Sequence, residues 1–182
     1  MFGPEGPVLA GKLDGKRAFM RQLEKVAALN EPVLVFLDFT GIELATSSFL
    51  SEAVIHFRDH LRLGSAPSYL AVANLNPSVS EELEELLKRS IDALIACRLS
   101  EDGQVSGGQL LGRLEPKLQE TFERVEQRGE ATAVELYNDS TSTDQIGPTA
   151  WNNRLNLLSA KSLLMETSLG RTKKFRPLLE TV

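Results

Sequence analysis

Three short apolar runs in the first half of the chain limit the fold more than any other feature. They are "PVLVFLD" at 32–38, "SYLAVANL" at 68–75 and "DALIACRL" at 92–99. Runs of this length with little polar alternation are typical of strands that are buried on both faces. Helical patterns separate them, so the sequence predicts an α/β fold in which helices cover a sheet with parallel neighbours.

The helical patterns themselves are clear. Residues 15–29 and residues 48–62 each place their apolar side chains on one stripe, and residues 78–90 follow a proline with serine as a candidate N-cap. The segment "SEDGQVSGG" at 100–108 is polar and carries three glycines, which indicates a domain boundary. We therefore expect an α/β domain at 1–102 and a second domain at 103–182.

The second domain has a different pattern, because the alternation of strands and helices stops after the boundary. A helix is expected from Glu115, with Pro116 in its first turn and Gly129 at its end. A shorter helix, "ATAVELYN", follows, and Pro148 opens a third. The last segment, "LLMETSLGRTKKFRPLL" at 163–179, reads as a hairpin that turns at Leu169-Gly170.

Charge is spread unevenly over the 182 residues. The formal net charge is −5, yet residues 151–177 hold six Lys and Arg against Glu166 alone. A small basic patch on an acidic protein indicates an anionic partner at that place on the surface.

The third helix of the second domain carries an unusual row of amides. Residues on one face, at helical spacing, are Thr149, Asn152, Asn153 and Asn156, and the opposite face carries Trp151, Leu155 and Leu158. Asparagine is an indifferent helix former, and its amide matches the major-groove edge of adenine. Arg154 on the flank can reach phosphate or guanine. The pattern predicts a recognition helix with Trp151 in the core.

The segment "AWNNRLNLLSAKSLL…GRTKKFRP", after two further helices, resembles the third helix and wing of winged helix-turn-helix domains. The resemblance covers about residues 109 to 180 and implies that the amide face meets bases. The cations that it places on phosphates from the wing are Arg171, Lys173, Lys174 and Arg176. The alternative is a protein-docking or dimerising module in which these cations protect a hairpin edge from aggregation.

In the first domain, "VFLDFTGIELATSSFLSEAV" resembles the signature of STAS domains, and especially the STAS-like family of uncharacterised domains related to anti-sigma-factor antagonists. The resemblance covers about residues 8 to 100. In the antagonists a partner kinase phosphorylates the first serine of the corresponding helix, and Ser47 takes that position here. The sequence departs from the antagonists at Thr46, which replaces an acidic residue, and at Phe49, which replaces a glycine.

The serine loop can also be explained without phosphorylation, because Thr46 or Ser47 can cap the N-terminus of the helix. Asp38 ends the first strand, and we expect it to bond the loop that follows. His56 and His60 are spaced as a metal-binding pair, but packing and helix-end roles are the expected ones. Cys97 is expected to be a buried thiol.

No phosphate-cradling glycine loop, catalytic triad or pair of catalytic carboxylates is evident, so we expect no enzymatic activity, no cofactor and no metal. The beginning of the sequence has no signal-peptide pattern, and no stretch is apolar enough for a transmembrane helix, which favours a cytoplasmic protein without membrane contact.

Together these features predict a STAS-like α/β domain followed by a winged helix-turn-helix that binds double-stranded DNA, with a regulatory protein docked on the STAS-like domain. The alternative is a partner-switching adaptor whose two domains bind only proteins. Homodimerisation is left open by the sequence.

Overall fold

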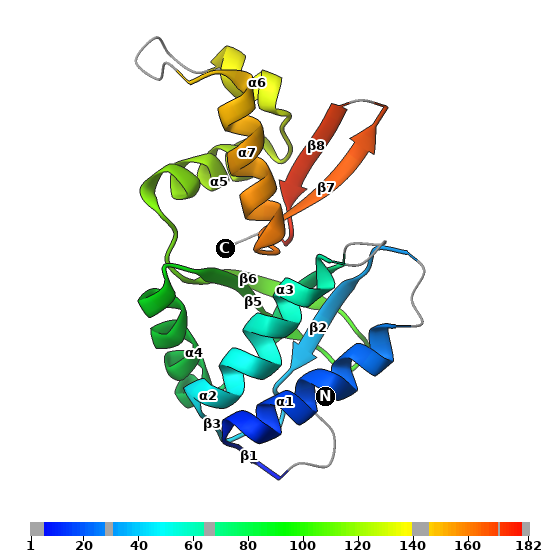
Figure 1. The fold of residues 1–182 in the computed structure, drawn as a ribbon, viewed down its shortest axis with the longest axis vertical. Coiled ribbons are helices and arrows are strands. Elements are labelled where there is room, and N and C mark those ends of the chain that lie inside the picture. The colour runs from blue at the N-terminus through cyan, green and yellow to red at the C-terminus, as the bar shows by residue number, and fades with distance from the viewer. Residues whose placement is uncertain (1–5, 28–30, 64–67, 140–145, 171, 180–182) are drawn as a thin grey trace.

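The three apolar runs form the parallel part of one sheet (Figure 1). β2 (Leu34–Asp38), β4 (Tyr69–Ala73) and β5 (Ala93–Leu99) are parallel, and β6 (Val105–Gly112) is antiparallel to β5, in the order β2-β4-β5-β6. Every residue of β4 is buried, as expected for a strand covered on both faces. This computed structural model of a mixed α/β protein describes residues 6–27, 31–63, 68–139, 146–170 and 172–179.

Helices cover the first face of the sheet. They are α1 (Lys12–Val26), the continuous helix made of α2 (Ser47–Leu50), the π-helical segment η1 (Ser51–His56) and α3 (Phe57–Leu61), and α4 (Pro77–Ser90). Their apolar side chains pack with Leu70, Val72 and Leu94 of the sheet into one hydrophobic core. A short parallel pair, β1 (Val8–Leu9) with β3 (Leu44–Ala45), lies beside this core.

A glycine allows α1 to approach the π-helical segment closely. A Cβ atom at Gly15 would lie 2.9 Å from the carbonyl oxygen of Phe49 and 3.0 Å from Cβ of Glu52. Any larger residue at position 15 would therefore separate the two helices. The buried Glu52 next to this contact is paired with Lys12 and His56.

The C-terminal unit, residues 113–179, covers the second face of the sheet. Its elements are α5 (Pro116–Arg128), α6 (Ala133–Asp139), α7 (Pro148–Ala160), β7 (Leu164–Leu169) and β8 (Thr172–Pro177). β7 and β8 form the predicted antiparallel hairpin, and Ala131 adds a single bridge to Phe175 of β8. Trp151, Leu155 and Leu158 are fully buried, which confirms the predicted apolar stripe.

The same core contains residues of both parts of the chain. Tyr69, Ala71, Ala93 and Ile95 of the sheet belong to the hydrophobic cluster that also holds Trp151. The C-terminal unit is therefore packed directly on the sheet, not attached to it through an exposed linker.

The division of the chain lies later than the sequence indicates. The sequence predicts that the second domain begins at residue 103, but Val105–Gly112 is β6 and pairs with β5 from Ala93 to Leu99. Residues 100–104 of the polar segment form the turn of this hairpin, in which Oγ of Ser100 accepts a hydrogen bond from the backbone N–H of Gln104, and residues 105–108 belong to β6. We call residues 6–112 the N-terminal unit.

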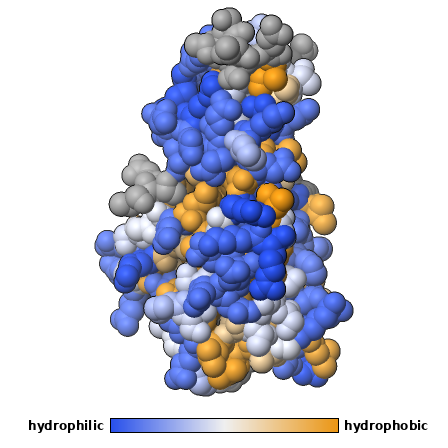
Figure 2. Space-filling model, turned by 90° about the vertical axis from the view of Figure 1, so that its left-hand side faces the viewer, coloured by the Kyte–Doolittle hydropathy of each residue, from blue (hydrophilic) through white to orange (hydrophobic). Residues whose placement is uncertain are grey.

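The distribution of hydrophilic and hydrophobic residues on the surface is consistent with the packing of the two units against each other. Figure 2 shows hydrophilic residues over most of one side of the molecule and hydrophobic residues gathered where the C-terminal unit meets the N-terminal unit. Among the described residues, no helix combines the length and the apolar character that crossing a membrane requires.

Candidate functional site

The amide face of α7 lies opposite its buried stripe. Thr149 and Asn153 are exposed, and Asn152 is half-buried. The side chains of Thr149 and Asn153 have no hydrogen-bond partner within the part of the chain that the structure describes. α7 begins at Pro148 and runs toward the sheet, so these residues occupy the half of the helix that is farther from the N-terminal unit (Figure 1).

Asn156 differs from the other amides of this face. Its Nδ2 donates to the carbonyl oxygen of Asn152 at 2.8 Å, and its Oδ1 accepts from Nζ of Lys173 at 3.3 Å. Both ends of the half-buried amide are thus used within the protein. Asn156 links α7 to the hairpin, and a base could reach it only by replacing these bonds.

Arg154 is placed by the buried tryptophan. Its guanidinium lies 5.0 Å from the ring centroid of Trp151, and the guanidinium of Arg124 lies at the same distance from that ring. Such cation–π contacts fix the direction of a long side chain. Arg154 is consequently half-buried beside the amide face instead of extended into solvent.

The cations of the hairpin are largely engaged with carboxylates. Nζ of Lys173 lies 3.3 Å from Oε2 of Glu166, and Lys174 pairs with Glu130. Arg176 is exposed, and its guanidinium contacts Sδ of Met165 at 3.8 Å. Arg171, the fourth predicted wing cation, lies outside the described residues.

One cation of the basic segment has a different role. Nζ of Lys161 lies 2.6 Å from Oδ1 of Asp92, and Arg58 donates to the other oxygen of this carboxylate at 2.8 Å. Burial alone would raise the pKa of Asp92, but the contacts with Arg58 and Lys161 outweigh it and hold that pKa below its ordinary value. Lys161 therefore forms an ion pair that joins the two units. It does not add to the positive charge that the basic segment presents on the surface, which is smaller than the sequence indicates.

A second polar cluster joins the units next to the first. The guanidinium of Arg62 donates to Oγ of Ser159 at 3.0 Å, lies 3.8 Å from Glu166 and stacks 4.4 Å above the ring centroid of Tyr69. The backbone N–H of Glu166 donates to the hydroxyl of Tyr69 at 2.8 Å. Glu166 therefore contacts both Arg62 of the N-terminal unit and Lys173 of the hairpin.

The serine loop places its residues in separate roles. Thr46 is the N-cap of α2 and accepts from the backbone N–H of Phe49 at 3.4 Å, so the cap is Thr46 and not Ser47. Ser47 is half-buried, and its backbone N–H and its hydroxyl both donate to Oε1 of Glu82 on α4, the N–H at 3.0 Å. A carboxylate thus lies directly against the predicted phosphoacceptor, while Ser48 is exposed.

The remaining candidates have structural partners. Oδ1 of Asp38 accepts from the backbone and hydroxyl of Thr40 and from Nδ2 of Asn74, which confirms the expected bond to the following loop. Nδ1 of His56 lies 2.9 Å from Glu52, and the His60 ring packs edge-on against Phe19. Cys97 is buried, and burial raises the pKa of its thiol to about 11.

Comparison with known proteins provides no further assignment. No family model, no curated protein and no solved structure matches the chain. The functional argument therefore rests on the chemistry of these residues.

Proposed function

We propose that the protein is a non-enzymatic, cytoplasmic regulator whose C-terminal unit is a winged helix-turn-helix that binds double-stranded DNA. The N-terminal unit is a STAS-like domain that docks a regulatory protein. The observation that carries the proposal is the exposed face of α7, where Thr149, Asn152 and Asn153 oppose the fully buried Trp151.

The order of elements supports this reading of the C-terminal unit. The elements follow one another as the helix α5, a single bridging residue at Ala131, the helices α6 and α7, and the β7–β8 hairpin in the position of the wing. In helix-turn-helix proteins the first turns of the recognition helix contact base edges. Thr149, Asn152 and Asn153 lie in those turns of α7, away from the sheet (Figure 1).

Phosphate contacts would come from the cations beside this face. Lys173 and Lys174 must exchange Glu166 and Glu130 for phosphate, whereas Arg176 needs no such exchange within the described residues. Exchange of one anion for another costs little at an exposed position, because surface ion pairs contribute about 0 to 1 kcal/mol. The carboxylates therefore weaken DNA binding without preventing it.

The test begins with selection of bound sequences from random duplex DNA, followed by fluorescence anisotropy of the selected duplex at several salt concentrations. Contacts from about four wing cations should give a slope of log affinity against log salt of about −3 to −4. Absence of duplex binding even in dilute buffer would contradict the proposal.

The adaptor alternative is favoured by a different observation, the contact of Ser47 with Glu82. A phosphate on Ser47 adds about −2 charge beside this carboxylate and would break the contact between α2 and α4. That change would alter the surface on which a regulatory protein docks. A chain that binds a protein partner only in the unphosphorylated state, and binds no duplex, would be such an adaptor.

A further inference from the structure

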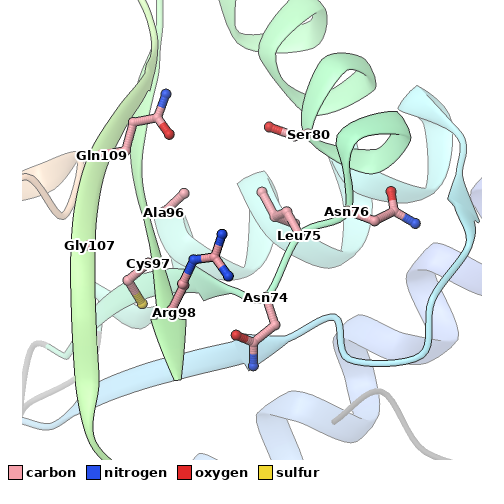
Figure 3. A pocket seen from close by; sticks show the side chains of 9 residues that line it. All are labelled: Asn74, Leu75, Asn76, Ser80, Ala96, Cys97, Arg98, Gly107 and Gln109. Atoms are coloured by element: carbon pink, nitrogen blue, oxygen red, sulfur yellow. The ribbon is translucent and has the colours of Figure 1, made fainter. Parts of the chain in front are cut away.

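We infer that the hollow between α4 and the β5–β6 hairpin is a binding site for a small organic anion that carries a phosphate or carboxylate group. The inference concerns the N-terminal unit and does not depend on DNA binding. Residues that line this hollow, which has a volume of about 370 Å³, are Asn74, Leu75, Asn76, Ser80, Ala96, Cys97, Arg98, Gly107 and Gln109 (Figure 3). The volume is within the range of small-molecule sites.

The hollow results from an irregularity in the hairpin. Ala96 pairs with Gln109, but Arg98 pairs with Ser106, so β6 contains one residue more than β5 over this stretch. Gly107 lies in the irregular part with φ of 63°, and no atom lies within 4 Å of the place where its Cβ would be. An extra residue of this kind bends a strand and re-aims its side chains. The irregular part of the hairpin and the first turn of α4 both line the hollow (Figure 3).

The walls of the hollow are held in place by hydrogen bonds. Nδ2 of Asn74 donates to Asp38, Thr40 and the carbonyl of Leu99, and its Oδ1 accepts from the backbone of Leu99. Asn76 caps α4 through Oδ1, and its Nδ2 donates to two backbone carbonyls of the 42–43 segment. Both amides are occupied, so they shape the site and leave binding to other groups.

Three polar groups without such partners surround the space. The Arg98 guanidinium, the Ser80 hydroxyl and the Gln109 amide come from three different elements, and none has a hydrogen-bond partner within the described part of the chain. Figure 3 shows the guanidinium and the hydroxyl on opposite sides of the hollow, with the amide above Ala96. An arginine can hold a phosphate or a carboxylate through two parallel hydrogen bonds.

The charge of the lining selects for an anion. Arg98 is the one charged residue among those that line the hollow. Burial, together with the charge of the nearby Asp38, raises the pKa of the Cys97 thiol to about 11, and Asp38 itself is not part of the lining. Leu75 and Ala96 supply an apolar floor between the polar groups. A ligand with an anionic group and a small apolar body fits this combination better than either a cation or a bare sugar.

The test uses the full chain labelled with ¹⁵N and three probes of similar size: phenyl phosphate, benzoate and the neutral benzyl alcohol. We expect one or both anions to shift amide resonances around residues 75–80, 96–98 and 107–109 in a saturable manner. Benzyl alcohol should bind at least roughly tenfold more weakly, because it lacks the charge-assisted bond to Arg98. The two anionic probes distinguish a phosphate site from a carboxylate site.

Two variants test whether the ligand binds in the hollow. Arg98→Gln should weaken the better anion by roughly tenfold or more. Arg89→Gln removes the same charge at an exposed position near the C-terminal end of α4 and should leave binding unchanged. Gly107→Asn keeps a residue that tolerates the left-handed backbone and adds a side chain at a position that lines the hollow, so it should weaken binding without removing a charge. Saturable shifts that persist in both Arg98→Gln and Gly107→Asn would overturn the inference. Equal binding of benzyl alcohol, or no saturable shift with either anion, would do so as well.

Discussion

Nζ of Lys161, directly after α7, lies 2.6 Å from Oδ1 of Asp92, directly before β5. Asp92 is only 6% exposed, and its second oxygen accepts from the equally buried Arg58. The pair joins a helix of the C-terminal unit to the sheet of the N-terminal unit. It fixes where α7 ends on the sheet, so the direction of the amide face depends on residues far from that face.

Asp92→Asn should destabilise the protein by about 3 kcal/mol, because it leaves Arg58 buried with a weaker set of partners. Lys161→Met should cost less, since its side chain is partly exposed. Urea unfolding measures both. Lys88→Met removes a lysine from an exposed pair with Glu84 and should leave the unfolding free energy unchanged within error. A similar small change in all three variants would show that the buried pair contributes no stability.

Acid should lower the free energy of unfolding through protonation of Asp92. The pKa of Asp92 is lower in the folded chain than its ordinary value of 3.8, so its ionised form contributes stability fully above that value. The contribution is lost as the pH falls through the folded-state pKa. We expect the unfolding free energy to decrease from about pH 5 to pH 3, and to decrease less steeply in Asp92→Asn. Parallel curves for the two proteins would exclude Asp92 as a source of the acid sensitivity.

Glu166→Gln should strengthen DNA binding if the hairpin cations contact phosphate. The substitution releases Lys173 from a carboxylate 3.3 Å away and leaves a group of equal size beside Arg62. A gain of about twofold to fivefold in affinity follows from the usual strength of such a pair. Glu85→Gln makes the same change of charge on α4 and should have no such effect. Anisotropy with the selected duplex distinguishes the two, and a loss of affinity in Glu166→Gln would show that the carboxylate positions the hairpin productively.

The amides and the lysines should affect DNA binding in different ways. Asn152→Ala or Asn153→Ala should lower affinity for the selected sequence by roughly 1 to 3 kcal/mol and relax the preference at one base pair. Lys173→Ala with Lys174→Ala should weaken all sequences alike and flatten the salt slope by about 2. Asn156→Ala does not separate a base contact from a structural contact, because the Asn156 amide forms hydrogen bonds with Asn152 and Lys173.

The stability of these variants is the control. Neither set touches the buried stripe, so neither should unfold the protein, whereas Trp151→Ala should cost about 3 to 5 kcal/mol through the cavity it leaves. If Asn152→Ala or Asn153→Ala lowered stability without changing sequence preference, the amides would be structural and the proposed recognition face would be wrong.

The sequence predicts those features of the fold that depend on residues close together in the chain. The runs that became β2, β4 and β5, and the spacing of Trp151 with Leu155, have local periodicity that backbone geometry imposes. Lys161 and Asp92 are 69 residues apart, and Arg62 and Ser159 are 97 apart. No local pattern distinguishes Lys161 from an exposed wing cation. The local sequence does not predict β6, because its glycines at 107 and 108 indicate a loop, although residues 109–112 pair regularly with β5.

The serine loop was ambiguous for a chemical reason. Threonine and serine are both good N-caps, so adjacent residues of these types leave the helix start uncertain by one position. Only the fold places Glu82 of α4 against Ser47, 35 residues earlier in the chain. That contact changes what a substitution at Ser47 should do.

Thr46→Ala should remove the cap of α2 and cost roughly 0.5 to 2 kcal/mol. Ser47→Ala should leave α2 capped and lose only the hydroxyl bond to Glu82. Ser47→Asp, a mimic of phosphorylation, should destabilise the protein more than Ser47→Ala, since it places a second carboxylate against Glu82. The double variant Ser47→Asp with Glu82→Gln should recover most of this loss, because the added carboxylate then faces an amide that can donate. Thermal unfolding of the unsubstituted protein, of Ser47→Asp, of Glu82→Gln and of the double variant tests the interaction. If Glu82→Gln destabilised the Ser47→Asp protein as much as it destabilised the unsubstituted one, the two side chains would not interact. A phosphate on Ser47 would then leave the contact between α2 and α4 intact.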